Sequence, residues 1–342
     1  MQTPYLKEIE NYYDESLRDY EIVWQLKKAM ALHYGYWDQT TNTHKQALWN
    51  MNFQVAKHAQ ISENDYVLDA GCGVGGTSFF LAKNIGCKVE GISLAPAHIQ
   101  RANQYKKNND PNNLTRFTCQ NFCQTHFQDH TFDVVFGIES VVHASIKQAF
   151  LKEAYRVLKP GGRLLISDYF LREPTTTVEK EILKKWGNSW AIENFIYEKE
   201  FHKQLKSEGF KSPHFFDITD KVYPSIKLMH RSYYPGIAFS SVQKLLGKTT
   251  QKRVENSKSG KFQYQAFQKK MWKYKHALAY KQVEKDVLPH ELNNPCELYI
   301  DHQTLKEQFP VFVKYGFRPR NILKRIMHFY LEKNIRNPNQ KF

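Results

Sequence analysis

The sequence predicts an α/β fold built on a doubly wound, mostly parallel sheet. Two observations carry this prediction. Strand-like apolar runs alternate strictly with helical patterns between residues 66 and 170, which is typical of a parallel sheet with helices on both faces. A glycine-rich turn, Gly71 to Gly76, follows the first run directly and leads into a helical pattern. In such a fold ligands bind beyond the carboxyl ends of the strands, which is where this turn lies.

The expected elements follow one another in order. The strand-like runs are Tyr66–Ala70, Cys87–Ser93, Leu114–Gln120, Phe132–Ile138 and Arg163–Tyr169. The helical patterns between them are Thr77–Asn84, Pro96–Asn108 and Lys147–Leu158. After residue 170 we expect helices at 176–192 and 198–208, a strand at Lys211–Ile218, a helix at 224–246, a polar, basic linker at Lys248–Lys261 and a strand near Trp272–Lys281.

Residues 1–60 predict a helical segment crowded with aromatic side chains and interrupted by a loop at 32–37. Two interpretations stay open for this segment. The helices pack as a layer on the following domain, or they form a lid that covers a ligand at the glycine turn.

Composition limits the class of protein. The chain has 342 residues, of which 41% are hydrophobic and 24% are charged, as in ordinary globular proteins. It contains no apolar run of about 18 residues and no amino-terminal signal pattern, so we expect a cytoplasmic protein. The net charge of +15 indicates an anionic partner: nucleic acid, a membrane surface or an anionic substrate. The cysteines are odd in number and form no CxxC pair, which favours reduced thiols without a metal site: Cys72, Cys87, Cys119, Cys123 and Cys296.

The glycine turn fits more than one kind of cofactor site. Gly71, Gly73 and Gly76 satisfy the GxGxxG pattern of dinucleotide-binding proteins, which is a weak signal by itself. Asp69 stands two residues before the first glycine. A second segment that contains proline and glycine, Leu158 to Gly162, leads into the fifth strand. This combination favours a different class of nucleotide-like cofactor.

Three segments carry a resemblance to a known family. Asp69 to Gly76, Gly91 to Pro96 and Leu158 to Gly162 resemble the class I S-adenosylmethionine-dependent methyltransferases in their order and separations. The resemblance implies a seven-stranded Rossmann-like sheet, S-adenosyl-L-methionine as cofactor and helical insertions after the fifth strand.

A narrower resemblance is to the small-molecule branch that contains tocopherol, sterol and geranyl diphosphate C-methyltransferases. It rests on Tyr12 to Asp14, His33 to Trp37 and Ile138 to His143. The implied organisation is an N-terminal helical lid (1–60), a methyltransferase domain (61–281) with substrate-covering helices at 172–208 and 224–270, and a C-terminal extension (282–342).

The resemblance also implies which residues bind the cofactor. Asp69 and the turn glycines Gly71, Gly73 and Gly75 would hold its methionine part. Ser93, Leu94 and His98 stand where this branch holds the ribose with a hydroxyl residue, a leucine and a glutamine. Asn121 would accept a hydrogen bond from the adenine amine, with Phe122 covering the ring. The methyl-bearing end would be contacted by Ile138 and His143 and by three aromatic residues of the lid: Tyr13, His33 and Tyr34.

Glu139 and His143 are the expected catalytic residues, with Glu139 as the base. His143 is expected to be a fixed hydrogen-bonding group, and a base is the alternative for it. A methylated alkene is a cation that must lose a proton, and the acid that matches Glu139 serves this role in prenyl-diphosphate relatives. An apolar pocket raises the pKa of such an acid toward the range useful for a base. The alternative is that Glu139 holds a lid residue or the cofactor amine. Val142 replaces the second glutamate of the tocopherol-like pattern, so a mechanism with two acids is not expected.

The acceptor is expected to be hydrophobic or aromatic, such as a prenyl, phenolic or sterol-like molecule, because many aromatic residues follow the fifth strand. The candidates for its pocket are Trp186, Trp190, Phe195, Tyr197, Tyr223 and Tyr234. N- or O-methylation of an amine or phenol is an alternative. A nucleic-acid methyltransferase is a second alternative, which the absence of an Asn-Pro-Pro-Tyr type motif does not favour.

A third alternative is a non-catalytic cofactor-binding module, which the extension 282–342 motivates. Within this extension, residues 314–336 predict a basic amphipathic helix. Such a helix packs on the parent domain or makes a peripheral contact with an anionic membrane surface.

Overall fold

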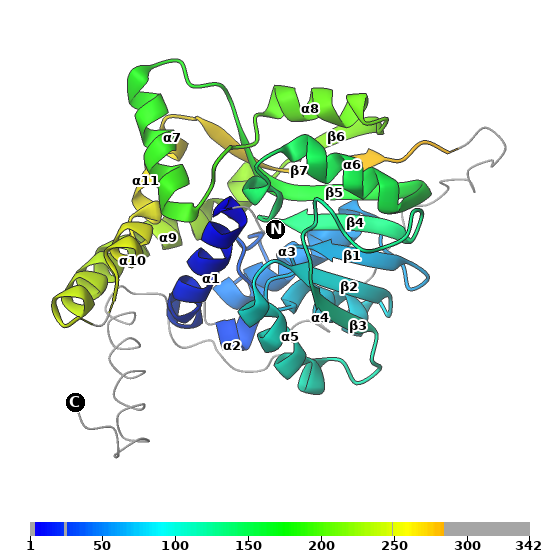
Figure 1. Ribbon diagram of the computed structural model, residues 1–342, viewed down its shortest axis with the longest axis horizontal. Helices are drawn as coiled ribbons and strands as arrows, with labels where there is room; N and C mark the ends of the chain where they lie inside the picture. The colour runs from blue at the N-terminus through cyan, green and yellow to red at the C-terminus, as the bar shows by residue number, and fades with distance from the viewer. Residues whose placement is uncertain (1–3, 24–25, 248, 284–342) are drawn as a thin grey trace.

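A seven-stranded sheet forms the centre of the computed structural model, which describes residues 4–23, 26–247 and 249–283 (Figure 1). Its strand order is β3-β2-β1-β4-β5-β7-β6. The parallel strands are β1 (Tyr66–Ala70), β2 (Lys88–Ser93), β3 (Thr115–Cys119), β4 (Phe132–Ile138) and β5 (Leu158–Leu171). The strand β7 (Trp272–Tyr280) lies between β5 and β6 (Lys211–Asp217) and is antiparallel to both. The predicted mostly parallel, doubly wound sheet is confirmed.

Helices cover both faces of this sheet because successive strand residues point to opposite sides. On one face, α3 (His44–His58) and α4 (Gly76–Asn84) pack residues such as Val55 and Phe80 against Val67 of β1. On the other face, α6 (Lys147–Val157) and α8 (Glu198–Ser207) pack Phe150 and Phe201 into the larger core. A further helix, α5 (Pro96–Asn109), joins β2 to β3. The strand order reverses between β1 and β4, which is where ligands bind in this architecture.

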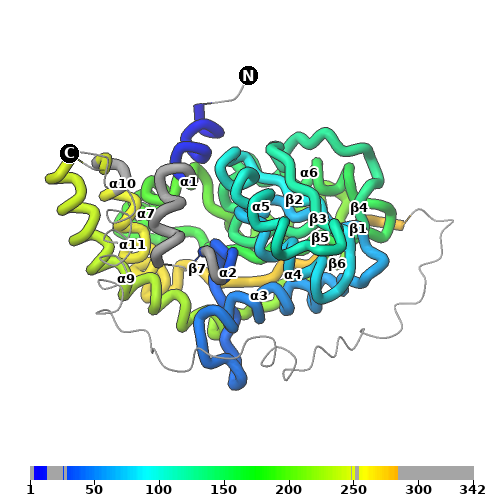
Figure 2. The backbone as a smooth tube through the Cα atoms, turned by 90° about the horizontal axis from the view of Figure 1, so that it is seen from below, coloured from blue at the N-terminus to red at the C-terminus, as the bar shows by residue number. Residues whose placement is uncertain are grey.

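The N-terminal segment lies at this reversal point. It comprises α1 (Pro4–Val23), the short α2 (Leu26–Ala29) and α3, with a loop between α2 and α3. Both views place α1 between the strands and a group of later helices (Figures 1 and 2). The Tyr5 hydroxyl of α1 donates to the carbonyl oxygens of His143 and Ala191, each at 3.1 Å, and so ties α1 to two segments beyond the strand ends.

The later helices gather on the side of α1 away from the strands (Figures 1 and 2). They are α7 (Thr177–Trp190), α9 (Thr219–Leu245), α10 (Gln251–Asn256) and α11 (Ser259–Gln268). The expected linker at 248–261 is therefore wrong, because α10 and α11 occupy most of it. Gly260 permits this packing, since a Cβ there would lie 2.9 Å from the Met229 carbonyl oxygen of α9.

Two further features of the described residues bear on the sequence predictions. Their four cysteines, Cys72, Cys87, Cys119 and Cys123, are free thiols. Among the described helices, none combines the length and apolar character that crossing a membrane requires. The extension from residue 284 onward, with Cys296 and the predicted helix at 314–336, lies outside the described residues.

Candidate active site

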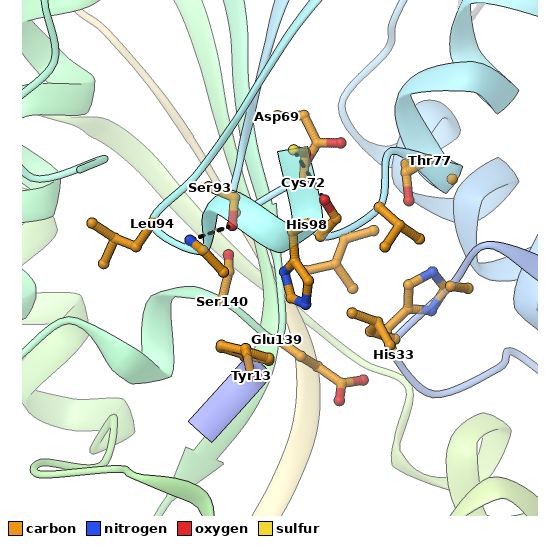
Figure 3. A pocket seen from close by; sticks show the side chains of 18 of the residues that line it. Tyr13, His33, Asp69, Cys72, Thr77, Ser93, Leu94, His98, Glu139 and Ser140 are labelled. Carbon is orange, nitrogen blue, oxygen red and sulfur yellow. Dashed lines mark hydrogen bonds between the residues drawn. The ribbon is translucent and has the colours of Figure 1, made fainter. Parts of the chain in front are cut away.

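A cavity of about 800 Å³, counting the part open to solvent, lies at the reversal point of the sheet. Figure 3 shows side chains from the ends of β1, β2 and β4, from α1 and from the loop after α2 directed around it. Its walls are formed by Ile9, Tyr13, Met30, Ala31, Leu32, His33, Asp69, Gly71, Cys72, Gly73, Val74, Gly76, Thr77, Ser93, Leu94, Ala95, His98, Phe122, Ile138, Glu139, Ser140 and His143.

The glycine turn forms one wall because side chains would fill it. Gly71 has a φ of +97°, and a Cβ there would lie 2.3 Å from the Cβ of Ser140. The amides of Gly71 and Cys72 both donate to the Ile92 carbonyl oxygen at 2.9 Å, which fixes the turn against β2. A Cβ on Gly76 would lie 2.0 Å from the Met30 carbonyl oxygen, so the loop after α2 rests directly on the turn. The positive end of the α4 dipole therefore faces a narrow, backbone-lined space.

Asp69 places a buried carboxyl group at this wall. Ser78 donates to its Oδ2 at 2.7 Å, and burial raises the pKa of Asp69 to about 7. Its Oδ1 accepts no hydrogen bond from the described residues and can pair with a ligand. A bound amine or other cation would favour the ionised carboxylate, because an opposite charge offsets the desolvation.

Ser93 and His98 form the wall beside β2. Ser93 Oγ accepts from the Ala95 amide at 3.2 Å (Figure 3). His98 is buried, and its Nε2 has no hydrogen-bond partner among the described residues. Burial lowers the pKa of His98 to about 4, so the ring is neutral. Because His98 lines the cavity, a ligand bound there can pair with this nitrogen.

Two further neutral histidines face the cavity. His33 Nδ1 lies 2.8 Å from the Tyr34 carbonyl oxygen, and the Asn52 side chain also interacts with the His33 ring. His143 Nε2 lies 3.0 Å from the hydroxyl of Tyr13 on α1. Burial lowers the pKa of both His33 and His143 to about 4. Because neither ring is charged at neutral pH, the cavity accepts a positively charged ligand without repulsion.

Glu139 follows β4 directly, with a left-handed φ of +49°. Its Oε1 accepts hydrogen bonds from the Tyr34 amide at 2.6 Å and the Tyr274 hydroxyl at 2.8 Å. Its Oε2 accepts a hydrogen bond from the Tyr169 hydroxyl. Burial raises the pKa of Glu139 to about 7, and these hydrogen bonds oppose the rise. The carboxyl group is held in one orientation and exchanges a proton near neutral pH.

A second, smaller cavity of about 380 Å³, again counting the part open to solvent, adjoins the first. The two share Tyr13, Leu32, Glu139 and His143 in their walls. The other residues that line the smaller cavity are Tyr12, Val142, Tyr169, Trp190 and Met229. Glu139 therefore lies where a ligand of the larger cavity meets a ligand of the smaller, largely aromatic one.

The larger cavity brings together most of the residues expected from the sequence: Tyr13, His33, Asp69, Gly71, Gly73, Ser93, Leu94, His98, Phe122, Ile138, Glu139 and His143. Three others lie behind its walls. The Tyr34 side chain is fully buried and donates to Gln263 Oε1. Gly75 caps α4. Asn121 Oδ1 accepts from the Cys123 amide at 2.9 Å.

The aromatic residues that were expected to line the acceptor pocket lie in different environments. Trp190 lines the smaller cavity, Trp186 is fully buried in the core and Tyr234 is 62% exposed. Sequence reasoning did not find Tyr169 and Tyr274, the two phenols that hold Glu139.

Fold and site together define a class I S-adenosylmethionine-dependent methyltransferase domain. The features typical of this class are the strand order, the glycine turn after β1 and the acidic residue Asp69. The resemblance seen in the sequence is confirmed by comparison with known proteins: residues 68–166 match the family described as "Methyltransferase domain". The cofactor of this class is S-adenosyl-L-methionine.

Two curated relatives act on lipophilic molecules by name. The chain is 30% identical over 215 residues to a sterol 24-C-methyltransferase of Debaryomyces hansenii, covering 62% of this chain and 55% of that protein. It is 34% identical over 147 residues to a 2-methyl-6-phytyl-1,4-hydroquinone methyltransferase of Synechocystis sp., covering 42% of this chain and 45% of that protein. The chain thus spans about half the length of these relatives.

A solved structure shows the same fold. Geranyl diphosphate C-methyltransferase from Streptomyces coelicolor A3(2), in complex with Mg²⁺, geranyl diphosphate and S-adenosyl-L-homocysteine, is similar with a TM-score of 0.63. The two chains are 18% identical, and the match covers 82% of this chain and 98% of the other.

Proposed function

We propose that this protein transfers a methyl group from S-adenosyl-L-methionine to a carbon atom of a small hydrophobic or aromatic acceptor, with Glu139 as the base. The position of Glu139 carries the proposal. Its carboxyl group lies in the wall common to both cavities, and its pKa is about 7. Prenyl, phenolic and sterol-like molecules are the acceptor classes that suit the aromatic side chains lining the smaller cavity.

The larger cavity fits the cofactor on several observations. Gly71 and Gly76 leave a space in which a Cβ has no room, so backbone can approach the methionine part closely. Asp69 Oδ1 is available to the ammonium group of that part. The buried Nε2 atom of His98 is available to its polar groups. The neutral state of the histidine rings suits a cofactor that carries a sulfonium.

S-adenosyl-L-methionine supplies an electrophilic methyl group on that sulfonium. The residues of the chain position the acceptor for in-line attack and exclude water. The rings of Tyr12, Tyr169 and Trp190 line the smaller cavity, and an aromatic face beside a cation is favourable by about 1–2 kcal/mol when desolvated. They would therefore stabilise positive charge that forms on an alkene or aromatic acceptor when its carbon is methylated.

Glu139 completes the reaction. Its ionised carboxylate takes a proton from the carbon next to the cationic centre, and the electron pair of that C–H bond restores the double bond or the ring. Tyr169 and Tyr274 hold the carboxylate during this step, and Tyr13 holds His143, which lines the same cavities. With a pKa near 7, about half of the Glu139 side chains are ionised at neutral pH, and the carboxylate is basic enough to accept the proton.

The names of the two curated relatives support a lipophilic acceptor and, for the sterol enzyme, a carbon target. The test is incubation with S-adenosyl-L-methionine carrying a labelled methyl group and pooled prenyl, phenolic, sterol and amine acceptors, read by mass spectrometry. We expect one labelled product with the methyl group on carbon. Label found on oxygen or nitrogen, or in added RNA or DNA, would contradict the proposal.

A further inference from the structure

The outer half of α9 carries an apolar face that is exposed in the part of the chain that the structure describes. Tyr234, Val242 and Leu245 are 62%, 52% and 87% exposed, and Ala238 is also exposed. The intervals between these four residues are four, four and three, so they lie on one side of the helix. Two buried residues of the same stretch, Ser232 and Ser240, lie on the opposite side, and the buried Pro235 lies at the border of the exposed side. We call Tyr234, Ala238, Val242 and Leu245 the α9 face.

Positive charge continues this face toward the start of α9. Lys227 and Arg231 are exposed, and their intervals of four and three residues place them in line with Tyr234. The Lys227 ammonium lies 4.8 Å from the centroid of the Tyr223 ring, which keeps it at the helix surface. One side of a single helix therefore presents two cations followed by an apolar stretch.

This helix also reaches the acceptor cavity. Met229, which follows Lys227 by two residues, lines the smaller cavity beside Glu139. Leu245 lies 16 residues further on, or about 24 Å along the helix at 1.5 Å per residue. Figure 1 shows α9 with α7, α10 and α11 on the side of the molecule away from β3. A molecule held at the far end of the α9 face is thus about 24 Å along the helix from Met229 and the cavity.

We propose that the α9 face, with Lys227 and Arg231, docks this protein on an anionic membrane surface. Apolar side chains that enter the headgroup region next to lysine and arginine are the features by which an interfacial helix binds anionic lipid. The net charge of +15 attracts such a surface and repels a second copy of the chain. Docking would give the protein access to an acceptor dissolved in the membrane. This advantage rests on the proposed function, whereas the docking itself does not.

The experiment is flotation of the full chain with vesicles of phosphatidylcholine alone or of phosphatidylcholine with phosphatidylglycerol. We expect flotation with the anionic vesicles, and a loss of it at high salt because salt screens the attraction. The double substitution Val242→Glu/Leu245→Glu should lower vesicle binding by about tenfold or more, since two apolar groups no longer leave water. Ile146→Glu is the matched control, because Ile146 is 66% exposed at the start of α6, and it should float like the native chain.

Calorimetric binding of S-adenosyl-L-methionine shows that each variant is folded, and it does not depend on any acceptor. Failure of the native chain to float, or equal flotation of the double variant, would overturn the proposal. So would loss of flotation through Ile326→Glu alone, which would assign the contact to the segment 314–336. A dimer in sedimentation that the double variant dissociates would make the α9 face a contact between copies instead.

Discussion

Removal of one hydroxyl group beside Glu139 should shift the pH dependence of turnover. The Tyr274 hydroxyl donates to Glu139 Oε1 at 2.8 Å, and the same oxygen also accepts from the Tyr34 amide. Tyr274→Phe deletes the first hydrogen bond and retains the ring. Because this bond stabilises the ionised carboxylate, the pKa of Glu139 should rise above its value of about 7.

The size of the shift follows from the strength of the bond. A hydrogen bond to a charged group contributes about 1.5–3 kcal/mol, and the lower end applies because the Tyr34 amide and the Tyr169 hydroxyl remain. At about 1.36 kcal/mol per unit, the pKa of Glu139 should rise by about one unit. The ionised fraction at pH 7 then falls from about one half to about one tenth. Turnover at pH 7 should fall about fivefold and should recover at higher pH.

The assay is a pH profile of kcat/KM for native protein and variant with the acceptor that the labelling screen finds. Activity rises with pH because only the ionised carboxylate takes the proton, and the rising limb should lie about one unit higher in the variant. Tyr66→Phe is the matched control, since the Tyr66 hydroxyl donates to Glu90 at 2.8 Å outside the site. An equal loss at every pH, or a limb that does not move, would refute the proposed role of Tyr274.

Three further substitutions test the cofactor site and the lid. Asp69→Asn should weaken S-adenosyl-L-methionine binding about tenfold or more in calorimetry, because the carboxylate no longer opposes the ammonium charge; unchanged affinity would contradict that pairing. Gly71→Ala should lower the free energy of unfolding by about 2 kcal/mol or more in urea titration, since its φ is +97° and the new Cβ meets Ser140 at 2.3 Å; a smaller loss would show that the turn adapts. Tyr13→Phe removes the contact with His143 at 3.0 Å and should raise the KM of the acceptor with little change in cofactor affinity; the reverse pattern would place Tyr13 on the cofactor alone.

The position of the larger cavity was predictable because its signals are local in the sequence. An apolar strand followed by glycines and a helical pattern specifies a strand, a turn and a helix start within 20 residues. The parallel sheet then brings Ser93 and Glu139 to the same edge as Asp69, because each stands at or near the carboxyl end of a strand. Strand ends therefore located the cavity without any knowledge of side-chain packing.

The groups that hold Glu139 were not predictable. Tyr169 lies within β5 and Tyr274 within β7, and their meeting depends on the antiparallel pairing of these two strands. Neither residue belongs to a motif, and both read as ordinary core aromatics. The helical state of α10 and α11 was missed for a related reason. Polar, serine-containing sequence predicts a linker, whereas burial of Val254, Ser259 and Gln263 among neighbouring helices supplies the stabilisation that local propensity lacks.

The most direct test of carbon methylation with Glu139 as base is the substitution Glu139→Gln, measured in two ways on one preparation. Calorimetry reports the affinity for S-adenosyl-L-methionine, and labelled-methyl transfer reports turnover. The glutamine side chain keeps the size of glutamate and cannot take a proton. Cofactor affinity should stay within about threefold while turnover falls about 100-fold or more, the usual contribution of a general base. Lost cofactor affinity, or turnover close to that of the native protein, would contradict the assignment of Glu139 as the base.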